Sequence, residues 1–284
     1  MTDQAATLRV LRGGKSPGGE LPPGRRAIAV GGGKGGVGKS TLAVNLAVAY
    51  AQAGTRTLVV DTDLGMADLN LLLGVAPDKS MLDALAGASI DDVLVAAHGI
   101  HLLPALNGSY LLSTIGPAAQ RRVLEIVQSL AARFDTLIVD VAAGIGQAQT
   151  TFAGATTDAI VVVNPEPLSM ADAYATLKVL ATEQRMTHAF VVPNRVTSRA
   201  QADELTARLG ALVSRFLDLQ ITALPPIPAD PAVGEAAQIG VPLLVHAPDA
   251  PAARAIRQLT RALATLAPAP AADASWFRAT GGTR

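Results

Sequence analysis

Short apolar runs alternate with longer segments of helical spacing along most of this 284-residue chain. Apolar runs without polar interruptions are typical of strands that are buried on both faces of a parallel sheet. They lie at residues 27–30, 57–60, 100–103, 136–140, 159–163 and 188–193. Segments with a helical pattern lie at residues 42–51, 80–97, 117–134 and 251–266. This alternation predicts an α/β fold with a doubly wound, mostly parallel sheet and helices on both of its faces.

A glycine-rich stretch joins the first apolar run to the first helical segment. It reads Gly-Gly-Gly-Lys-Gly-Gly-Val-Gly-Lys-Ser-Thr from Gly31 to Thr41 and contains the pattern G-x-x-x-x-G-K-[ST]. Backbone N–H groups of such a loop, together with the helix N-terminus behind it, hold phosphate. We expect Lys39 to reach the β- and γ-phosphates and Ser40 to place its hydroxyl on Mg²⁺. The residues predicted to bind nucleotide here are Gly33, Lys34, Gly35, Gly36, Val37, Gly38, Lys39, Ser40 and Thr41.

Lys34 is a second lysine inside the loop, directly after the first glycine of the motif. This form resembles the deviant phosphate loop of the MinD/ParA ATPases, which are P-loop NTPases of the SIMIBI type. The resemblance implies an ATP-dependent homodimer in which Lys34 acts as a catalytic residue on the nucleotide of the second subunit. A cation supplied in this way would neutralise charge that develops on the transferred phosphoryl group. The alternative is a solvated loop lysine.

Aspartates follow two of the apolar runs. Asp61 and Asp63 end the run at 57–60, and Asp140 ends the run at 136–140. The carboxyl ends of parallel strands border the ligand crevice of such a sheet, where acidic side chains suit Mg²⁺ and water activation. The resemblance implies that Asp61 supports the magnesium shell and that Asp63 polarises the attacking water. We expect Asp140 to hold a magnesium-bound water, so the predicted metal set is Ser40, Asp61 and Asp140. Exposed loop carboxylates are the alternative.

Two later positions are candidates for the base of the nucleotide. Asn194 follows the apolar run at 188–193, and an amide can pair with an adenine edge through one donor and one acceptor. In the family an asparagine at this place has that role, although asparagine is also common where strands end. Pro228 lies in a loop that resembles the family's I-P-x-D segment, which closes over the base.

Three further segments resemble the flagellar FlhG/FleN branch of the MinD/ParA class. Residues 61–74 read D-T-D-L-G-M-A-D-L-N-L-L-L-G, and residues 66–73 are expected to form a helical switch whose leucines pack in the core or a dimer interface. Residues 164–174 contain N-P-E-P-L-S-M-A-D-A-Y, in which Ser169 and Asp172 also have the spacing of a helix-capping box. Val141 stands after Asp140 where the branch commonly has threonine.

The third segment is a short amphipathic stretch at the N-terminus. Residues 3–12 read D-Q-A-A-T-L-R-V-L-R and resemble the activator motif of the flagellar branch. That resemblance implies that the stretch stimulates an FlhF-type GTPase, with flagellar C-ring proteins and a flagellar transcription regulator as further partners. A frayed terminus without function is the alternative. The predicted partner-binding residues are Asp3, Gln4, Ala5 and Leu8.

Composition narrows the choice of function. The chain has 23 basic and 23 acidic residues, so no whole-protein basic field favours nucleic acid, and direct DNA binding is not expected. It has no cysteine, which argues against the iron–sulfur members of the same superfamily. The four histidines show no metal-ligand spacing and are expected to be structural. No apolar run is long enough to span a bilayer, and we expect a cytoplasmic protein.

The last helical segment, at 251–266, carries Arg254, Arg257 and Arg261 away from its apolar face. A core-packed helix with a solvated arginine face, an anionic-lipid contact and non-specific DNA binding are the three interpretations, in that order. Residues 267–284 are expected to be a disordered tail, and their Trp276 leaves membrane contact open. We therefore expect an N-terminal activator helix at 1–12, a flexible linker at 13–25, one ATPase domain at 26–266 and this tail.

Together these features predict a slow ATPase, with ATP and Mg²⁺ as its ligands, that dimerises with ATP and regulates flagellar number or placement. A location at the inner face of the cell membrane at the pole fits that function. Two alternatives remain on the same fold. One is a MinD/ParA-like positioning ATPase for another cargo, and the other is a small-molecule ligase or kinase.

Overall fold

The computed structural model describes residues 26–63, 68–105, 117–131, 133–144 and 146–266. The predicted activator helix with Asp3, Gln4, Ala5 and Leu8, the linker and the C-terminal tail lie outside these residues. Part of the expected helical switch at 66–73 also does, and within the described part it forms α3 (Leu69–Leu72). Leu69 and Leu73 are buried in the core, whereas Leu71 is exposed.

A single sheet organises the described residues. Its strands are β1 (Arg26–Gly31), β2 (Thr57–Asp61), β3 (Val95–Ala97), β4 (Ile100–Leu103), β5 (Thr136–Asp140), β6 (Asp158–Val163), β7 (His188–Val196), β8 (Gln220–Ala223) and β9 (Ile227–Pro228). Their order is β3-β4-β2-β5-β1-β6-β7-β8, with β9 paired to β7. Only the β3–β4 pair is antiparallel among the described strands. The predicted doubly wound, mostly parallel sheet is therefore confirmed.

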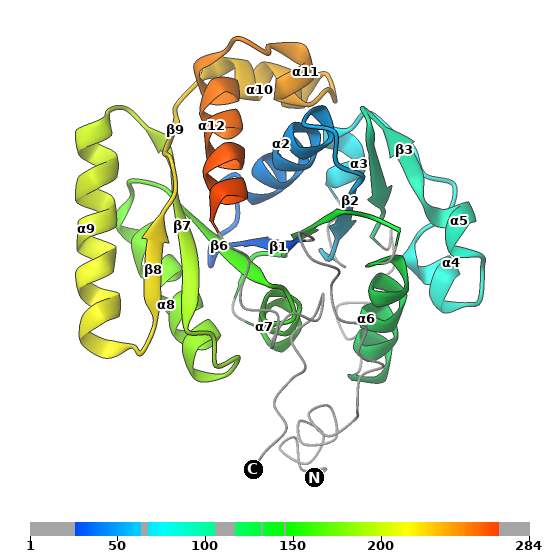
Figure 1. Cartoon of the computed structure of the whole chain (residues 1–284), viewed down its shortest axis with the longest axis horizontal. Helices are drawn as coiled ribbons and strands as arrows, with labels where there is room; N and C mark the ends of the chain where they lie inside the picture. The colour runs from blue at the N-terminus through cyan, green and yellow to red at the C-terminus, as the bar shows by residue number, and fades with distance from the viewer. Residues whose placement is uncertain (1–25, 64–67, 106–116, 132, 145, 267–284) are drawn as a thin grey trace.

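Helices cover both faces of the sheet because successive residues of each buried strand point to opposite sides. Besides α3, the helices are α2 (Lys39–Gln52), α4 (Met81–Leu85), α5 (Ile90–Val93), α6 (Pro117–Ala131), α7 (Gln147–Gly154), α8 (Pro167–Thr182), α9 (Arg199–Phe216), α10 (Pro231–Gln238), α11 (Leu243–His246) and α12 (Pro251–Thr265). On β1, Ala27 and Ala29 face one core with α4, α6, α7, α8 and α9, and Ile28 and Val30 face the other with α2, α3, α10, α11 and α12. Figure 1 shows α2 and α12 on one side of β1 and α7 on the other.

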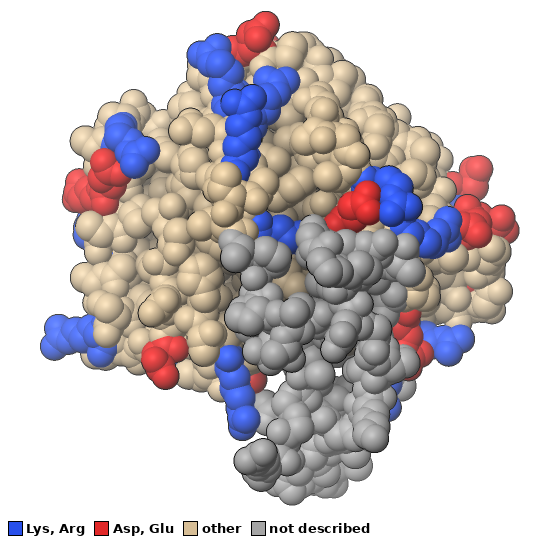
Figure 2. Space-filling view, viewed as in Figure 1, with Lys and Arg blue, Asp and Glu red and all other residues tan. Residues whose placement is uncertain are grey.

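The structure confirms that the apolar face of the last helical segment, predicted at 251–266, packs in the core. Ile256, Leu259 and Leu263 of α12 are almost fully buried against α2 and the sheet. The arginines on its outer side are visible as blue side chains over α12 in Figure 2. Arg254 and Arg257 donate to backbone carbonyls of Asp249 and Pro248, and the described residues place no carboxylate within ion-pair distance of them.

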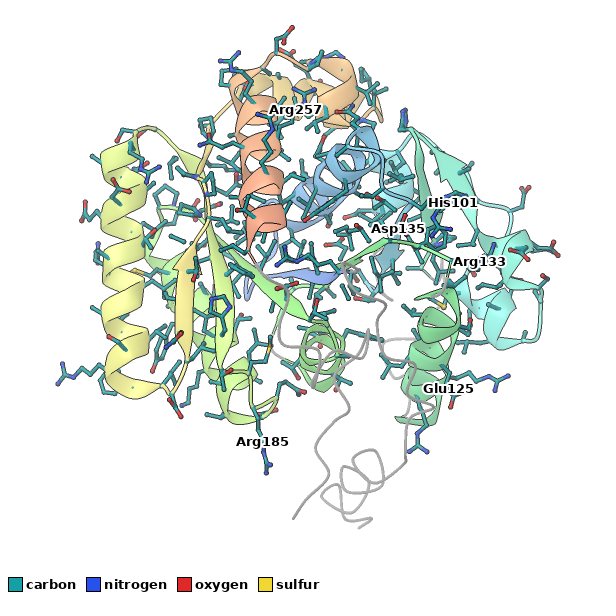
Figure 3. The ribbon with its side chains drawn as sticks, viewed as in Figure 1. His101, Glu125, Arg133, Asp135, Arg185 and Arg257 are labelled. Carbon is teal, nitrogen blue, oxygen red and sulfur yellow. The ribbon has the colours of Figure 1, made fainter. Side chains whose placement is uncertain are left out.

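Three of the four histidines, His98, His101 and His188, take part in packing or hydrogen bonds of the fold. His101 of β4 lies edge-on to Phe134, with 5.1 Å between ring centroids. Burial, and the positive charge of Arg133, lower the pKa of His101; Figure 3 labels both residues beside the end of α6. No described helix is long and apolar enough to cross a membrane.

Candidate nucleotide-binding site

The phosphate loop connects β1 to α2 at the carboxyl end of the sheet. Gly36 and Gly38 have φ angles of 77° and 98°, in a region that residues with a Cβ rarely adopt. Gly38 is the residue before α2, so the free N–H groups of the first helical turn lie directly behind the loop. This arrangement of backbone donors and a helix N-terminus is suited to hold phosphate.

The parallel register places the predicted carboxylates next to this loop. Asp61 of β2 lies opposite Asp140 of β5, and Asp140 lies opposite Val30 at the end of β1. The Thr62 hydroxyl donates to the Asp140 carbonyl oxygen at 2.6 Å, which ties the two strand ends together. The structure therefore brings both aspartates to the position that the sequence predicts.

Lys39, the first residue of α2, is buried against the loop. Its Nζ donates to the Lys34 carbonyl oxygen at 3.1 Å, and only 7% of the residue is exposed. Burial lowers the pKa of Lys39, although the charges of Asp140 and Asp63 act in the opposite direction. A buried ammonium group that the neighbouring carboxylates only partly compensate is well placed to bind phosphate.

Asp61 and Asp140 are both at least 97% buried. Burial raises the pKa of Asp140 to about 7, against the effects of a hydrogen bond from Ser40 and of the charge of Lys39. Burial and the charge of Asp140 also raise the pKa of Asp61 well above its usual range, although backbone N–H groups of Asp63 and Leu69 favour its charged form. Two buried carboxylates with raised pKa values indicate a place for a cation.

The donors present fit Mg²⁺. Asp140 Oδ1 is buried without a hydrogen-bond partner in the described part of the chain, and the Ser40 hydroxyl bonds to the same carboxyl group. Among the described residues, no group of three or more acidic or histidine side chains forms a complete metal cage. Mg²⁺ is usually held by one or two carboxylates together with waters and phosphate oxygens, and Asp140, Asp61 and the Ser40 hydroxyl supply oxygen donors of this kind.

Asn194 lies directly behind the phosphate loop. Its Nδ2 donates to the Val37 carbonyl oxygen at 2.7 Å, and a Cβ on Gly38 would come within 2.5 Å of the same nitrogen. Pro228 of β9 pairs with Val196 near the end of β7. Asn194 therefore lies beside the loop, and Pro228 lies further along the same pair of strands. Contact of either residue with a base stays a prediction.

The family follows from comparison with known proteins. The ParA family model, described as NUBPL iron-transfer P-loop NTPase, matches residues 24–264. The chain belongs to the ParA family. It is 36% identical over 215 residues to the antiactivator FleN of Pseudomonas aeruginosa, covering 75% of this chain and 77% of FleN. It is also 30% identical over 213 residues to the flagellum site-determining protein YlxH of Helicobacter pylori, covering 74% and 72%.

One solved structure has a similar fold over most of this chain. It is the septum site-determining protein MinD of Pyrococcus horikoshii, complexed with Mg-ADP, with a TM-score of 0.71 and 26% identity over 84% of this chain and 96% of that chain. The predicted resemblance to MinD/ParA P-loop NTPases, and to their FlhG/FleN branch, is therefore confirmed. These relatives support a positioning ATPase that binds nucleotide.

Lys34 is a predicted loop residue whose side chain has its partner outside the loop. Its Nζ forms an ion pair with Glu166 Oε2 of the same chain at 3.0 Å, and the two side chains are 39% and 53% exposed. Glu166 precedes α8 and was not among the predicted site residues. Because the two residues are 132 positions apart, no sequence spacing indicates their contact.

The capping-box prediction for Ser169 and Asp172 is wrong. The helix begins earlier, at Pro167, and Ser169 lies inside its first turn. The Ser169 hydroxyl instead accepts a hydrogen bond from the Asn164 N–H at 2.9 Å. Proline is favoured in the first turn of a helix because it lacks an N–H that would stay unpaired there, and this moves the start upstream.

A close backbone contact joins the loop to α8 and gives a testable prediction. A Cβ on Gly33 would lie 2.4 Å from the Asp172 carbonyl oxygen, whereas a Cβ on Gly35 meets nothing within 4 Å. We expect Gly33→Ala to lower the free energy of unfolding by about 1–3 kcal/mol, because the loop or α8 must shift. The matched variant Gly35→Ala should stay close to wild type in urea unfolding without nucleotide. Equal stabilities of the two variants would contradict the contact.

Proposed function

We propose that this protein is an ATP-dependent dimerising switch that hydrolyses ATP slowly and regulates flagellar number or placement. The names of the relatives FleN and YlxH support the flagellar part. The two loop lysines support the switch. Lys39 is buried within its own site, whereas Lys34 lies on the outside of the loop and is half exposed. This difference in environment is the observation that carries the proposal.

Lys34 is free to change partners at little cost. Its ion pair with Glu166 is solvent-exposed, and exposed pairs contribute only about 0.2–1 kcal/mol. A triphosphate held by a second copy carries more negative charge than one carboxylate and offers Lys34 a stronger partner. In this proposal Lys34 leaves Glu166 when ATP brings two copies together, and it returns after hydrolysis.

The other site residues would prepare and align the reaction. Backbone N–H groups of the loop and the N-terminus of α2 hold the phosphates, and Lys39 neutralises their charge. Ser40, Asp61 and Asp140 would hold Mg²⁺, which neutralises charge on the β- and γ-phosphate oxygens. Asp63 is half-buried, and its N–H donates to Asp61 Oδ1 at 2.9 Å, which fixes its position beside the metal residues. We assign Asp63 the orientation of the attacking water.

The partners belong to the same proposal. Asp3, Gln4, Ala5 and Leu8 would present an amphipathic segment to an FlhF-type GTPase, with flagellar C-ring proteins and a transcription regulator as further partners. The location that suits this activity is the cytoplasm, with peripheral attachment at the inner face of the cell membrane at the pole.

Mass in solution and flagellar counts test the proposal together. Light scattering of the purified protein should show a monomer with Mg-ADP and a dimer with Mg-ATP. Deleting the gene should change the number or position of flagella, and the wild-type gene should restore them. A monomer in both nucleotides would exclude the switch, whereas an ATP-dependent dimer with normal flagella would point to another cargo. Steady turnover that depends on a metabolite would favour the ligase or kinase.

The contact between Glu166 and Lys34 predicts in which direction a substitution of Glu166 changes the affinity of the dimer. Glu166→Gln removes the charge that holds Lys34 within its own chain, so the dimer with Mg-ATP should become about two- to fivefold tighter. Sedimentation over a range of protein concentrations measures this change. Glu204→Gln is the matched control, because it removes an exposed carboxylate that lies 3.8 Å from Arg208 on α9. A weaker dimer in Glu166→Gln would show that Glu166 contributes to the interface instead of competing for Lys34.

A further inference from the structure

The first turn of α8 exposes a small apolar face. Leu168 is 69% exposed, the largest value for any large apolar side chain in the described ranges. Pro167 and Ala171, which lie on the same side of the helix, are exposed as well. The described part of the chain leaves this face uncovered, although the other side of α8 packs in the core through Ala173 and Leu177.

This turn is held rigidly against the phosphate loop. Ser169, beside Leu168, is 2% exposed, and its hydroxyl accepts the hydrogen bond from the Asn164 N–H at the end of β6. Three residues further on, the Asp172 carbonyl lies so close to Gly33 that it leaves no room for a Cβ. Leu168 therefore has a fixed position relative to the loop, and covering it costs little ordering entropy.

The start of α8 combines opposite charges with the exposed Leu168. Glu166 lies two residues before Leu168 and forms the ion pair with Lys34, so an anion, a cation and an apolar side chain belong to the place where α8 meets the loop. A two-fold interface brings the same patch of both subunits into contact, and such a patch must match itself in charge and in polarity. A second copy of this chain satisfies both requirements.

We propose that Leu168 is the apolar anchor of the nucleotide-dependent contact between two copies of this protein. The inference rests on the proposed function, because it places Leu168 in the same interface that brings Lys34 to the nucleotide of a second copy. When two copies meet with ATP bound, both Leu168 side chains become buried in the interface, next to the two Lys34 side chains that each reach the other copy. The buried leucines then stabilise the dimer, while the lysines make it depend on the nucleotide.

The first test measures dimer affinity. In the Asp63→Ala background with Mg-ATP, Leu168→Ser should weaken dimerisation about 100-fold, since two apolar side chains are lost per dimer. Phe216→Ser is the matched control, because Phe216 of α9 is 59% exposed and should leave dimerisation unchanged. A fluorescent ATP analogue should bind both variants within twofold of the parent protein, which shows that the loop is intact.

The second test measures whether the position is covered. The chain has no cysteine, so Leu168→Cys and Phe216→Cys each carry a single thiol. Mg-ATP should slow maleimide labelling of the Leu168→Cys thiol at least tenfold relative to Mg-ADP, and it should leave labelling of the Phe216→Cys thiol unchanged. Protection without a doubling of mass would overturn the proposal, because something other than a second copy then covers the position.

The failure of this inference can be told apart from the failure of the proposed function. A parent protein that stays monomeric with Mg-ATP would refute the switch and the anchor together. A parent protein that dimerises with Mg-ATP, while Leu168→Ser dimerises equally well, would refute the anchor alone.

Discussion

Replacing Lys34 by alanine is expected to lower the ATP hydrolysis rate at least about 10³-fold while ATP binding by the monomer changes only a few-fold. A cation supplied from a second subunit contributes 10³–10⁵ to the rate in phosphoryl transfer, because it neutralises charge that appears only in the transition state. Among the described residues, the Lys34 ammonium group pairs with Glu166, the residue before α8, and the Lys34 carbonyl oxygen accepts a hydrogen bond from Lys39. Its side chain therefore has little influence on nucleotide binding within one subunit.

The measurement is phosphate release under saturating Mg-ATP, combined with mass in solution. Lys79→Ala is the matched control, since Lys79 also forms an exposed ion pair, with Asp92 at 2.8 Å, and has a similar side-chain exposure of 41%. Both variants remove one exposed lysine and one exposed ion pair, but only Lys34 lies on the loop. A Lys34→Ala protein that hydrolyses ATP at the wild-type rate would show that each subunit works alone.

Much of the site could be predicted from the sequence because it lies in local motifs at strand ends. The apolar run before Asp61 and the one before Asp140 each predict a buried strand, and parallel pairing then brings the two carboxylates together. The loop motif likewise places Lys39 and Ser40 without any long-range information. In such cases a local pattern and a general rule of sheet geometry determine the neighbours.

Contacts between distant segments could not be predicted in this way. The Lys34–Glu166 pair and the approach of Asp172 to Gly33 depend on how α8 packs against the loop. The helix start at Pro167 was missed because Ser169 and Asp172 have a capping spacing that tertiary structure overrides, since Ser169 bonds back to β6. The long helix α9 and the short α7 were not among the predicted elements either.

The second large effect is expected for Asp63→Ala, which should lower the hydrolysis rate about 10²–10⁴-fold and leave the ATP-dependent dimer intact. Asp63, which orients the attacking water in this proposal, would also accept its proton, and removal of such a group usually lowers the rate by about this factor. The contact between Asp63 and Asp61 is made by the backbone N–H of Asp63, so alanine keeps it. The metal residues and the lysines are not altered, and nucleotide binding should persist.

This variant separates the formation of the dimer from its dissociation. With Mg-ATP it should stay dimeric for hours by light scattering, whereas the wild-type dimer should decay as phosphate is released. Asp203→Ala, which removes an exposed carboxylate paired with Arg199 on α9, should decay like wild type. If hydrolysis ends the dimeric state, the lifetimes of the Asp63→Ala dimer and the wild-type dimer must differ by the same factor as the hydrolysis rates of the two proteins. If the Asp63→Ala dimer dissociates at the wild-type rate without releasing phosphate, dissociation is not coupled to hydrolysis. Lys34 would then leave the nucleotide of the second subunit for another reason.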